Sequence, residues 1–180
     1  KCMHSALEIL KPLIIAEKTA DIGTVVIGTV QGDLHDIGKK IVAMMMEAAG
    51  FSVVDLGVSV PPETFIEAIK EHNPVIVGFS ALLTTTMNMQ WETTKQIEAE
   101  GLREGVHIFV GGAPISQNWC DKIGADAYCG DALVAVDKAK ACISNLKELK
   151  GGDPELHASL LAIDTAREEE KLKEAQAAAG

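Results

Sequence analysis

Residues 24–49 read TVVIGTVQGDLHDIGKKIVAMMMEAA, and this stretch decides the fold. Its opening run, residues 24–30, is almost continuously apolar, as is typical of a parallel strand that is buried on both faces. After a polar loop, apolar residues recur from residue 39 to residue 49 at the spacing of one helical face. The predicted inward face of that helix consists of Ile41, Met44, Met45 and Ala48. A buried strand, a polar loop and a helix in this order predict one unit of an α/β domain.

The same alternation repeats along the chain. Further β-rich runs cover residues 51–57, 75–80, 107–112 and 127–130. A second helix pattern opens at Pro61, and others cover residues 87–100, 117–123 and 132–149. The repeated alternation predicts an α/β fold with a flavodoxin-like (Rossmann-like) five-stranded parallel sheet in the order 2-1-3-4-5 and helices on both faces. Ligands of such sheets bind beyond the carboxyl ends of the strands, at the switch between strands one and three.

Two appendages flank this domain, which we place at residues 20–150. Residues 1–19 contain an apolar helix pattern at 4–16 and are expected to be the last helix of something larger, with an extended lead-in. Residues 151–180 are expected to form a C-terminal helical tail that is amphipathic at first and then highly charged. The sequence therefore predicts one ligand-binding domain with a short helical segment on each side.

The charge of the chain argues against two classes of partner. Its 180 residues carry a net charge of −10, whereas nucleic acid and anionic membrane surfaces both require a basic face. No apolar run reaches the ~18 residues of a membrane span. No CxxC pair or zinc pattern is present, so the cysteines are predicted to be free thiols in a reducing cytoplasm. They are Cys2, Cys120, Cys129 and Cys142.

Three loops meet at the predicted switch point, namely residues 31–39, 80–86 and 111–114. Asp33 and His35 are two residues apart in the first loop, so the carboxylate can reach the imidazole. A metal-bound histidine usually donates its second ring N–H to such a carboxylate, which fixes its tautomer. A hydroxyl from the second loop, on Thr84 or Thr86, could extend the pair to solvent and let protons pass as a metal changes its oxidation state.

Other interpretations of the same residues stay open at this point. His35 could be a solvated or capping residue, and Asp33 could cap the next helix. Glycine-rich loops also bind phosphates, but neither GxGxxG nor GxxxxGK[ST] occurs here. A flavin site would need stacking aromatic residues, whereas both tryptophans, Trp91 and Trp119, are predicted in mid-helix. The methionines at 44–46 are better explained by core packing than by a cofactor site.

The pattern Asp33-x-His35-x-x-Gly38, then Ser80-x-Leu82, then Gly111-Gly112 resembles the three-part signature of cobalamin-binding domains, over about residues 20–147. The resemblance implies cobalamin or a related cobamide, bound base-off/His-on with His35 as the lower axial ligand of cobalt. It further implies that Asp33 hydrogen-bonds His35 and that Thr86 completes an Asp–His–Ser/Thr triad that takes part in the chemistry.

The same resemblance implies a slot between sheet and helices for the nucleotide tail of the cofactor, where small residues let the tail pass close to the backbone. The slot would be lined by Ser80, Leu82, Thr84, Gly111 and Gly112. The remaining implied contacts are Ile37 and Gly38 under the ring, Val58, Val60 and Pro61 beside it, Tyr128, Asp131 and Ala132 along the tail, and Gly32, Leu34, Asp36 and Ala113 elsewhere around the cofactor.

Residues 28–42 and 55–63 look like the methyltransferase branch of that family, and in particular like the small corrinoid subunits of anaerobic methyltransferase systems. This implies a carrier that shuttles a methyl group on cobalt. Its partners would be a substrate-specific methyltransferase, an acceptor methyltransferase for tetrahydrofolate or coenzyme M, and a reductive activator. Such a carrier has little activity alone, so its status as an enzyme stays open. Those carriers have an N-terminal helical cap, of which only residues 4–16 here resemble the final helix.

Three alternatives to the methyl carrier remain. One is the corrinoid subunit of an adenosylcobalamin-dependent mutase, and another is a corrinoid-responsive sensor domain. The third is a flavodoxin-like interaction module without a cofactor.

Overall fold

A parallel sheet forms the centre of the molecule, seen in a computed structural model that describes residues 22–146. The strands are β1 Thr24–Thr29, β2 Ser52–Asp55, β3 Ile76–Ser80, β4 His107–Gly111 and β5 Ala127–Cys129. They lie in the order β2-β1-β3-β4-β5, and every neighbouring pair is parallel. The predicted fold class and strand order are therefore confirmed. The expected N-terminal helix at 4–16 and the C-terminal tail lie outside the described residues.

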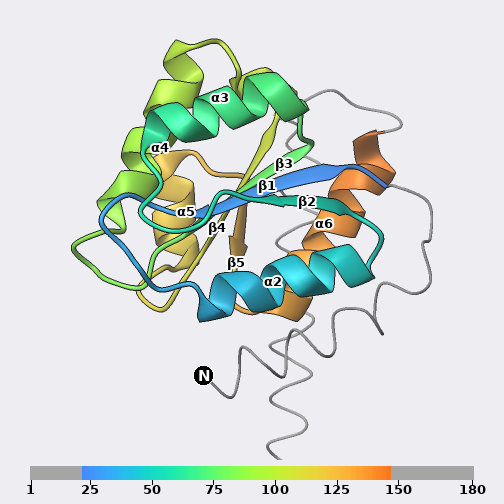
Figure 1. Cartoon of the computed structure of the whole chain (residues 1–180), viewed down its shortest axis with the longest axis horizontal. Coiled ribbons are helices and arrows are strands. Elements are labelled where there is room, and N and C mark those ends of the chain that lie inside the picture. Colours follow the sequence, from blue (N-terminus) through green and yellow to red (C-terminus); the bar gives the residue numbers. More distant parts are fainter. Residues whose placement is uncertain (1–21, 147–180) are drawn as a thin grey trace, which may run out of the picture.

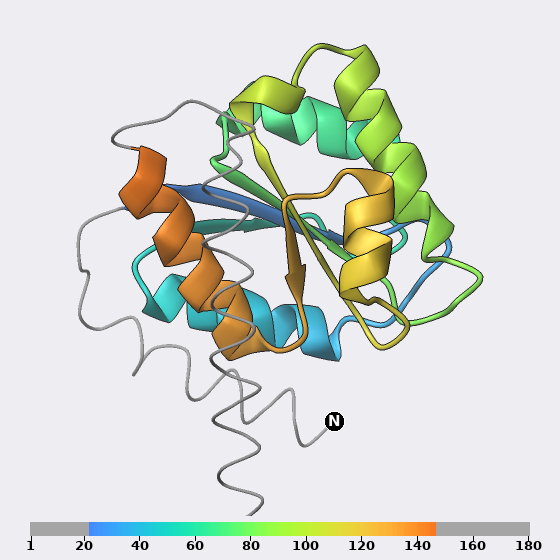
Figure 2. The ribbon, with the colours of Figure 1, turned by 180° about the vertical axis from the view of Figure 1, so that it is seen from behind.

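Helices cover both faces of the sheet (Figure 1). One face carries α2 Ile37–Ala48 and α6 Ala132–Leu146, which pack against each other. The opposite face carries α3 Pro62–His72, α4 Asn88–Ala99 and α5 Gln117–Ile123, as the reverse view in Figure 2 also shows. A short 3-10 helix, η1 Arg103–Gly105, precedes β4. Separate apolar clusters fill the two sides, so the sheet is the middle layer of three.

The strands all point toward one side of the domain, and this fixes where a ligand can bind. We call this side the carboxyl edge and define it by the loops 30–36, 56–61, 81–87, 112–116 and 130–131. The opposite side, the amino edge, consists of the connections at 49–51, 73–75, 100–106 and 124–126. The loops predicted to meet at the switch point all belong to the carboxyl edge.

The prediction of which side chains α2 buries is wrong. The side chains that α2 buries are Lys39, Ala43 and Met46. Of the predicted face, Ala48 is exposed and the other members are only half-buried. Residues 41–46 are all apolar and surround the helix, so the pattern predicts a helix without fixing which side faces the sheet. Core packing is nevertheless confirmed for the methionine run, since Met46 is buried and Met45 packs against the core.

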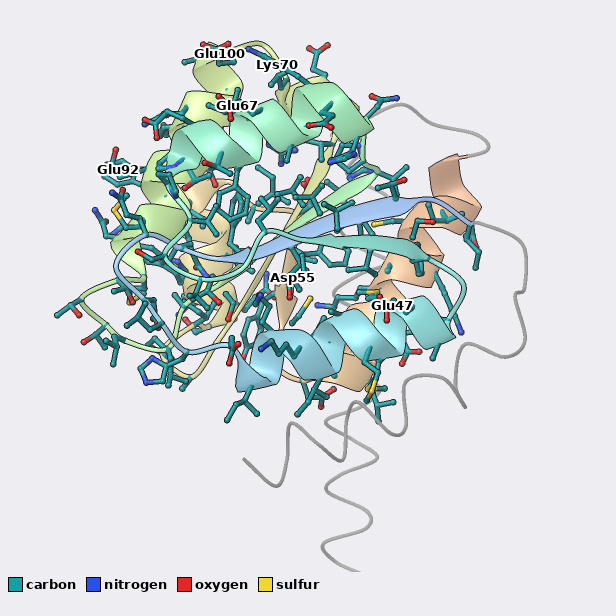
Figure 3. The ribbon with its side chains drawn as sticks, in the orientation of Figure 1. Glu47, Asp55, Glu67, Lys70, Glu92 and Glu100 are labelled. Carbon is teal, nitrogen blue, oxygen red and sulfur yellow. The ribbon has the colours of Figure 1, made fainter. Side chains whose placement is uncertain are left out.

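Acidic side chains lie on the outer surfaces of the helices (Figure 3). Glu67 projects from α3 and Glu92 from α4, while the Lys70 ammonium lies 2.6 Å from the Glu100 carboxylate and links α3 to the end of α4. Among residues 22–146, no helix has both the length and the apolar character needed to cross a membrane.

No disulfide joins the described cysteines, whose side chains are thiols as predicted. Cys120 and Cys142 are buried and Cys129 is half-buried, whereas Cys2 lies outside the described residues. Burial raises the pKa of the Cys142 thiol to about 12, so this side chain stays protonated inside the fold.

Candidate functional site

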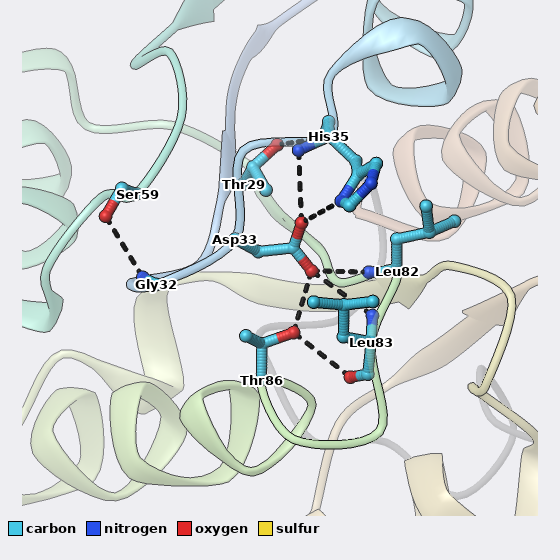
Figure 4. Close-up of polar contacts among 8 residues, drawn as sticks. All are labelled: Thr29, Gly32, Asp33, His35, Ser59, Leu82, Leu83 and Thr86. Atoms are coloured by element: carbon cyan, nitrogen blue, oxygen red, sulfur yellow. Dashed lines mark hydrogen bonds and ion pairs between the residues drawn. The ribbon is translucent and has the colours of Figure 1, made fainter.

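A fully buried carboxylate organises the carboxyl edge (Figure 4). Asp33 follows β1, and its Oδ1 lies 3.1 Å from the backbone N of His35 and 2.7 Å from Nδ1 of the same residue. Its Oδ2 accepts hydrogen bonds from the backbone N–H groups of Leu82 (2.7 Å) and Leu83 (3.3 Å). The Thr86 hydroxyl donates to the same oxygen at 2.7 Å. The first and second loops of the predicted site are therefore joined through one side chain.

These donors set the charge of Asp33 and the tautomer of His35. Burial alone would raise the pKa of Asp33, but the hydrogen bonds from Thr86, His35 and Leu82 outweigh it and hold that pKa well below its usual range. Asp33 is therefore a carboxylate at neutral pH and can only accept hydrogen bonds. The proton between the two side chains must lie on Nδ1 of His35, which leaves the lone pair of the ring on Nε2.

The His35 ring is open to ligands and has apolar neighbours. Its side chain is 53% exposed, whereas the Asp33 side chain is fully covered. Leu34, beside it, is 72% exposed, an unusual position for a large apolar side chain. Further exposed large apolar side chains at this edge, or in the first turns of α2 and α6 that follow it, are Ile37, Val58, Leu82, Leu83 and Leu133. We call Leu34 and these five side chains the apolar collar. The remaining exposed large apolar side chain among residues 22–144, Trp91, lies on α4.

The collar and His35 together suit a large, flat, apolar ligand with a metal at its centre. An exposed apolar patch of this kind marks an interaction site, and an imidazole with its Nδ1 proton engaged is a common metal ligand. Within residues 22–146 no cluster of three or more His, Cys, Asp or Glu side chains could hold a bare metal ion. One exposed imidazole offers a single nitrogen ligand, which fits a metal whose other ligands belong to a macrocycle.

The glycine pair of the predicted tail slot lies where β4 leaves the sheet. Gly111 pairs with Ser80 of β3 and Cys129 of β5, so the three strand ends are adjacent. Gly112 has φ 130°, and a Cβ built there would lie 1.7 Å from the carbonyl oxygen of Ala81. The contact between these two loops therefore requires glycine at 112, a reason internal to the chain and additional to the predicted room for a cofactor tail.

A buried amide network behind the slot was not predicted. Gln90, in the first turn of α4, is fully buried. Its Nε2 donates to the carbonyl oxygens of Phe79 (3.1 Å) and Gly111 (3.3 Å), and its Oε1 accepts from the Trp119 indole N–H at 3.0 Å. Gln90 thus ties the ends of β3 and β4 to α4 and α5. Trp91 and Trp119 lie within helices, as predicted.

Most of the predicted contacts lie where a ligand at the carboxyl edge could reach them. The exposed members are Gly32, Leu34, Ile37, Gly38, Val58, Leu82, Thr84 and Ala113. The half-buried members are Asp36, Ser80, Gly111, Gly112, Tyr128, Asp131 and Ala132. Of the two candidate hydroxyls, Thr86 is buried and bonded to Asp33, whereas Thr84 faces solvent.

Two of the predicted contacts have structural roles that the sequence did not suggest. Val60 is only 3% exposed, pairs with Val30 and belongs to the core on the α3 side, so its side chain is covered by protein. Asp131 caps α6, because its Oδ1 accepts the Val134 backbone N–H at 2.9 Å. Val58, two residues before Val60, does reach the surface.

Three residues that hold the site in place were missed. The Thr29 hydroxyl donates to the His35 carbonyl at 2.9 Å, and the Ser59 hydroxyl accepts the Gly32 N–H at 3.0 Å. The buried Lys39 ammonium forms an ion pair with Asp55 at the end of β2. Only the position of Thr29, directly before the loop, could have drawn attention, since the other two act across separate segments.

The chain matches known proteins over the region just described. Residues 23–139 match the family model "B12 binding domain". Trimethylamine corrinoid protein 1 of Methanosarcina acetivorans is 48% identical over 145 residues, 79% of this chain and 67% of that protein. The structure of the Methanosarcina barkeri monomethylamine corrinoid protein matches with a TM-score of 0.71 and 37% identity, over 76% of this chain and 65% of that one.

The methanol:cobalamin methyltransferase complex MtaBC of Methanosarcina barkeri is also similar, with a TM-score of 0.66 and 34% identity over 69% of this chain and 47% of that one. The chain thus spans about two thirds of the length of the methylamine corrinoid proteins that it matches. Motifs, fold and matches agree, and the chain belongs to the B12-binding domain family, in the branch that contains the methylamine corrinoid proteins.

Proposed function

We propose that this chain is a methyl carrier that binds a cobamide and presents it to partner enzymes. The observation that carries the proposal is the Asp33–His35 pair, whose imidazole is 53% exposed on the side of the sheet where the apolar collar also reaches solvent. The relatives support the same function, because they are corrinoid proteins of trimethylamine and monomethylamine systems.

His35 would be the lower axial ligand, with the cofactor base-off/His-on. The bound cobamide would supply the cobalt that accepts and releases the methyl group. Asp33 would act through His35, since it holds the Nδ1 proton and so keeps Nε2 available for the metal. Thr86 would act one step further back, because its hydroxyl donates to the carboxylate oxygen that does not contact His35.

The rest of the carboxyl edge would orient the ring and keep water from beneath it. Leu34, Ile37 and Leu82 supply apolar surface beside His35, and Gly38 offers room because a Cβ there would meet no atom within 4 Å. The tail slot would be lined by Ser80, Leu82, Thr84, Gly111 and Gly112. The side chains of Val60 and Asp131 are already engaged in the core and in the cap of α6, which favours Val58 and Ala132 as the nearby contacts.

The proposed partners follow from this role. They are a substrate-specific methyltransferase, an acceptor methyltransferase for tetrahydrofolate or coenzyme M, and a reductive activator. Similarity to the methanol:cobalamin methyltransferase complex supports the first of them. We place the carrier in the cytoplasm, where thiols outside disulfides, such as those of Cys120 and Cys142, persist. The net charge of −10 favours neither nucleic acid nor membrane as a partner.

Reconstitution with methylcobalamin tests the proposal. The purified protein should stay coloured after gel filtration and show the red spectrum of a nitrogen-ligated cofactor. His35→Ala should bind the cofactor in its yellow, base-off form. The matched control is His72→Ala, since His72 is exposed at the end of α3 on the amino edge, and it should stay red. A colourless wild-type protein would contradict corrinoid binding, and a His35→Ala protein that is red with methylcobinamide, which has no base of its own, would contradict the ligand assignment.

A further inference from the structure

Ser59, in the loop between β2 and α3, has an unusual backbone conformation. Its φ is 51°, in the left-handed region that L residues other than Asn, Asp and Gly seldom adopt. Among residues 22–146 one other non-glycine residue has a positive φ, Asn73, at 44°. Asn73 ends α3, where a left-handed asparagine is an ordinary helix cap. Ser59 ends no helix, so its conformation needs another source of support.

Two hydrogen bonds to the His35 loop provide that support, and Figure 4 shows the first of them. The Ser59 hydroxyl oxygen accepts the Gly32 N–H at 3.0 Å. The Ser59 backbone N–H donates to the Asp33 carbonyl oxygen at 2.9 Å. One residue therefore holds two consecutive residues of the loop that carries His35, from a segment 27 positions away.

Ser59 can serve as an anchor because its own loop is fixed to the sheet. The next residue, Val60, donates its N–H to the Thr29 carbonyl at 2.9 Å and pairs with Val30 in the core. Asp33 is thus hydrogen-bonded by two different loops. Ser59 holds its main chain from the β2–α3 loop, while the β3–α4 loop binds its carboxylate through Leu82, Leu83 and Thr86.

We propose that Ser59 is a positioning residue that fixes Asp33 and, through it, the orientation and tautomer of His35. This inference rests on the proposed function for its consequence, which is that His35 stays aimed at the metal. Removal of the hydroxyl would free the Gly32 N–H and loosen the turn before Asp33. The hydrogen bond between Nδ1 of His35 and Asp33 would then be formed for a smaller fraction of the time. The fraction of bound cofactor without the His35 ligand would rise about fivefold, which corresponds to the loss of one net hydrogen bond.

Two variants separate the hydroxyl from the backbone conformation. Ser59→Ala removes the acceptor and keeps a Cβ in the left-handed region. Ser59→Gly removes the acceptor but is free to adopt that region. Asn73→Ala is the matched control, because it places alanine in the same conformation on the amino edge, far along the chain from the His35 loop.

The first measurement uses the protein without cofactor. Nitrogen-15 NMR of labelled histidines at pH 8 distinguishes the two neutral tautomers of each imidazole. The wild type and Asn73→Ala should give the Nδ1–H pattern for His35. Both Ser59 variants should shift toward a mixture of tautomers. A wild-type pattern in Ser59→Gly would overturn the proposal, because the hydroxyl would then be dispensable.

The second measurement uses methylcobalamin and compares the yellow, His-off fraction of bound cofactor. Ser59→Ala and Ser59→Gly should both exceed the wild type by about fivefold, and Asn73→Ala should match it. Equal red spectra in wild type and Ser59 variants would overturn the role of Ser59 and leave the methyl-carrier proposal intact. A wild-type protein that takes up no corrinoid would end the methyl-carrier proposal, while the NMR measurement would still decide the role of Ser59.

Discussion

Two histidines at opposite edges of the sheet face aspartates in contrasting ways. At the carboxyl edge, the half-exposed His35 has its Nδ1 2.7 Å from the Asp33 carboxylate. At the amino edge, His107 begins β4 and is only 4% exposed. Its Nδ1 lies 4.0 Å from the Asp126 carboxylate and has no hydrogen-bond partner within residues 22–146.

The other partners of each aspartate explain the difference. Asp126 is already engaged by the Ile108 N–H at 2.6 Å and by the Arg103 guanidinium at 2.8 Å, and His107 stays beyond hydrogen-bond reach. Burial and Arg103 lower the pKa of His107 more than Asp126 raises it, so the ring is neutral. An Asp–His pair therefore prepares a metal ligand only where the imidazole is both bonded and exposed. At the amino edge, His107 packs in the interior and Asp126 bonds Arg103 and the Ile108 N–H.

Removal of the two carboxylates, one at each edge, should give the largest difference in the free energy of unfolding. Asp33→Ala leaves the buried donors of Leu82 and Thr86, among others, without an acceptor, and should lower the free energy of unfolding by about 3–5 kcal/mol. Asp126→Ala strands fewer buried donors and should cost about 1–3 kcal/mol. Urea denaturation measures both values. A larger loss for Asp126→Ala would mean that the amino edge carries more of the stability than its hydrogen bonds imply.

Glycine replacement should give the next largest difference. Gly112→Ala adds a Cβ that would lie 1.7 Å from the Ala81 carbonyl oxygen at a φ of 130°, and should cost about 3 kcal/mol. Gly101→Ala at the amino edge is the matched control. It has a φ of 70° and no atom within 4 Å of the added Cβ, so only backbone strain of about 1 kcal/mol is expected. Thermal denaturation compares the two, and equal costs would show that the loops after β3 and β4 can separate freely.

The smallest of these effects should be a pH dependence of the free energy of unfolding that comes from His107. Its pKa is below the ordinary 6.5 in the folded protein. As the pH falls below 6.5, the unfolded chain takes up a proton that the folded chain does not, so stability decreases until the lowered pKa is reached. The slope should be at most about 1.4 kcal/mol per pH unit. Asp33, whose folded pKa is depressed, contributes in another window, with stability lost only as the pH falls below 3.8.

His107→Leu should flatten this slope below about pH 6.5 in a series of urea denaturations, because the group that takes up the proton is removed. Asn73→Ala, at the exposed end of α3, removes no titrating group and is the control that should keep the slope. An unchanged slope in His107→Leu would place the proton uptake on another group.

Local patterns were enough to predict the layers of this fold. The apolar runs of β1, β3 and β4, together with the alternation of strands and helices, predicted the parallel order and thus the edge at which loops 31–39 and 80–86 meet. The two-residue spacing of Asp33 and His35 predicted their contact, which the hydrogen bond at 2.7 Å confirms. These features depend on neighbours in sequence or on general rules of topology.

Features that depend on contacts between distant segments could not be predicted. The side of α2 that faces the sheet depends on packing against distant strands. In the structure that packing buries Lys39 and leaves Ala48 exposed. The left-handed Ser59 is held by the Gly32 loop, and the amide network of Gln90 joins four elements. No local pattern encodes these contacts, because each partner is ordinary in its own segment.

The most direct test of the central claim is electron paramagnetic resonance of the cobalt(II) form of the reconstituted protein, prepared with natural or nitrogen-15 histidine. If His35 is the axial ligand, the superhyperfine triplet of the natural protein should become a doublet in the labelled one. Both patterns should disappear in His35→Ala and persist in His107→Leu. A triplet that survives labelling would assign the nitrogen to the cofactor's own base and contradict ligation by His35.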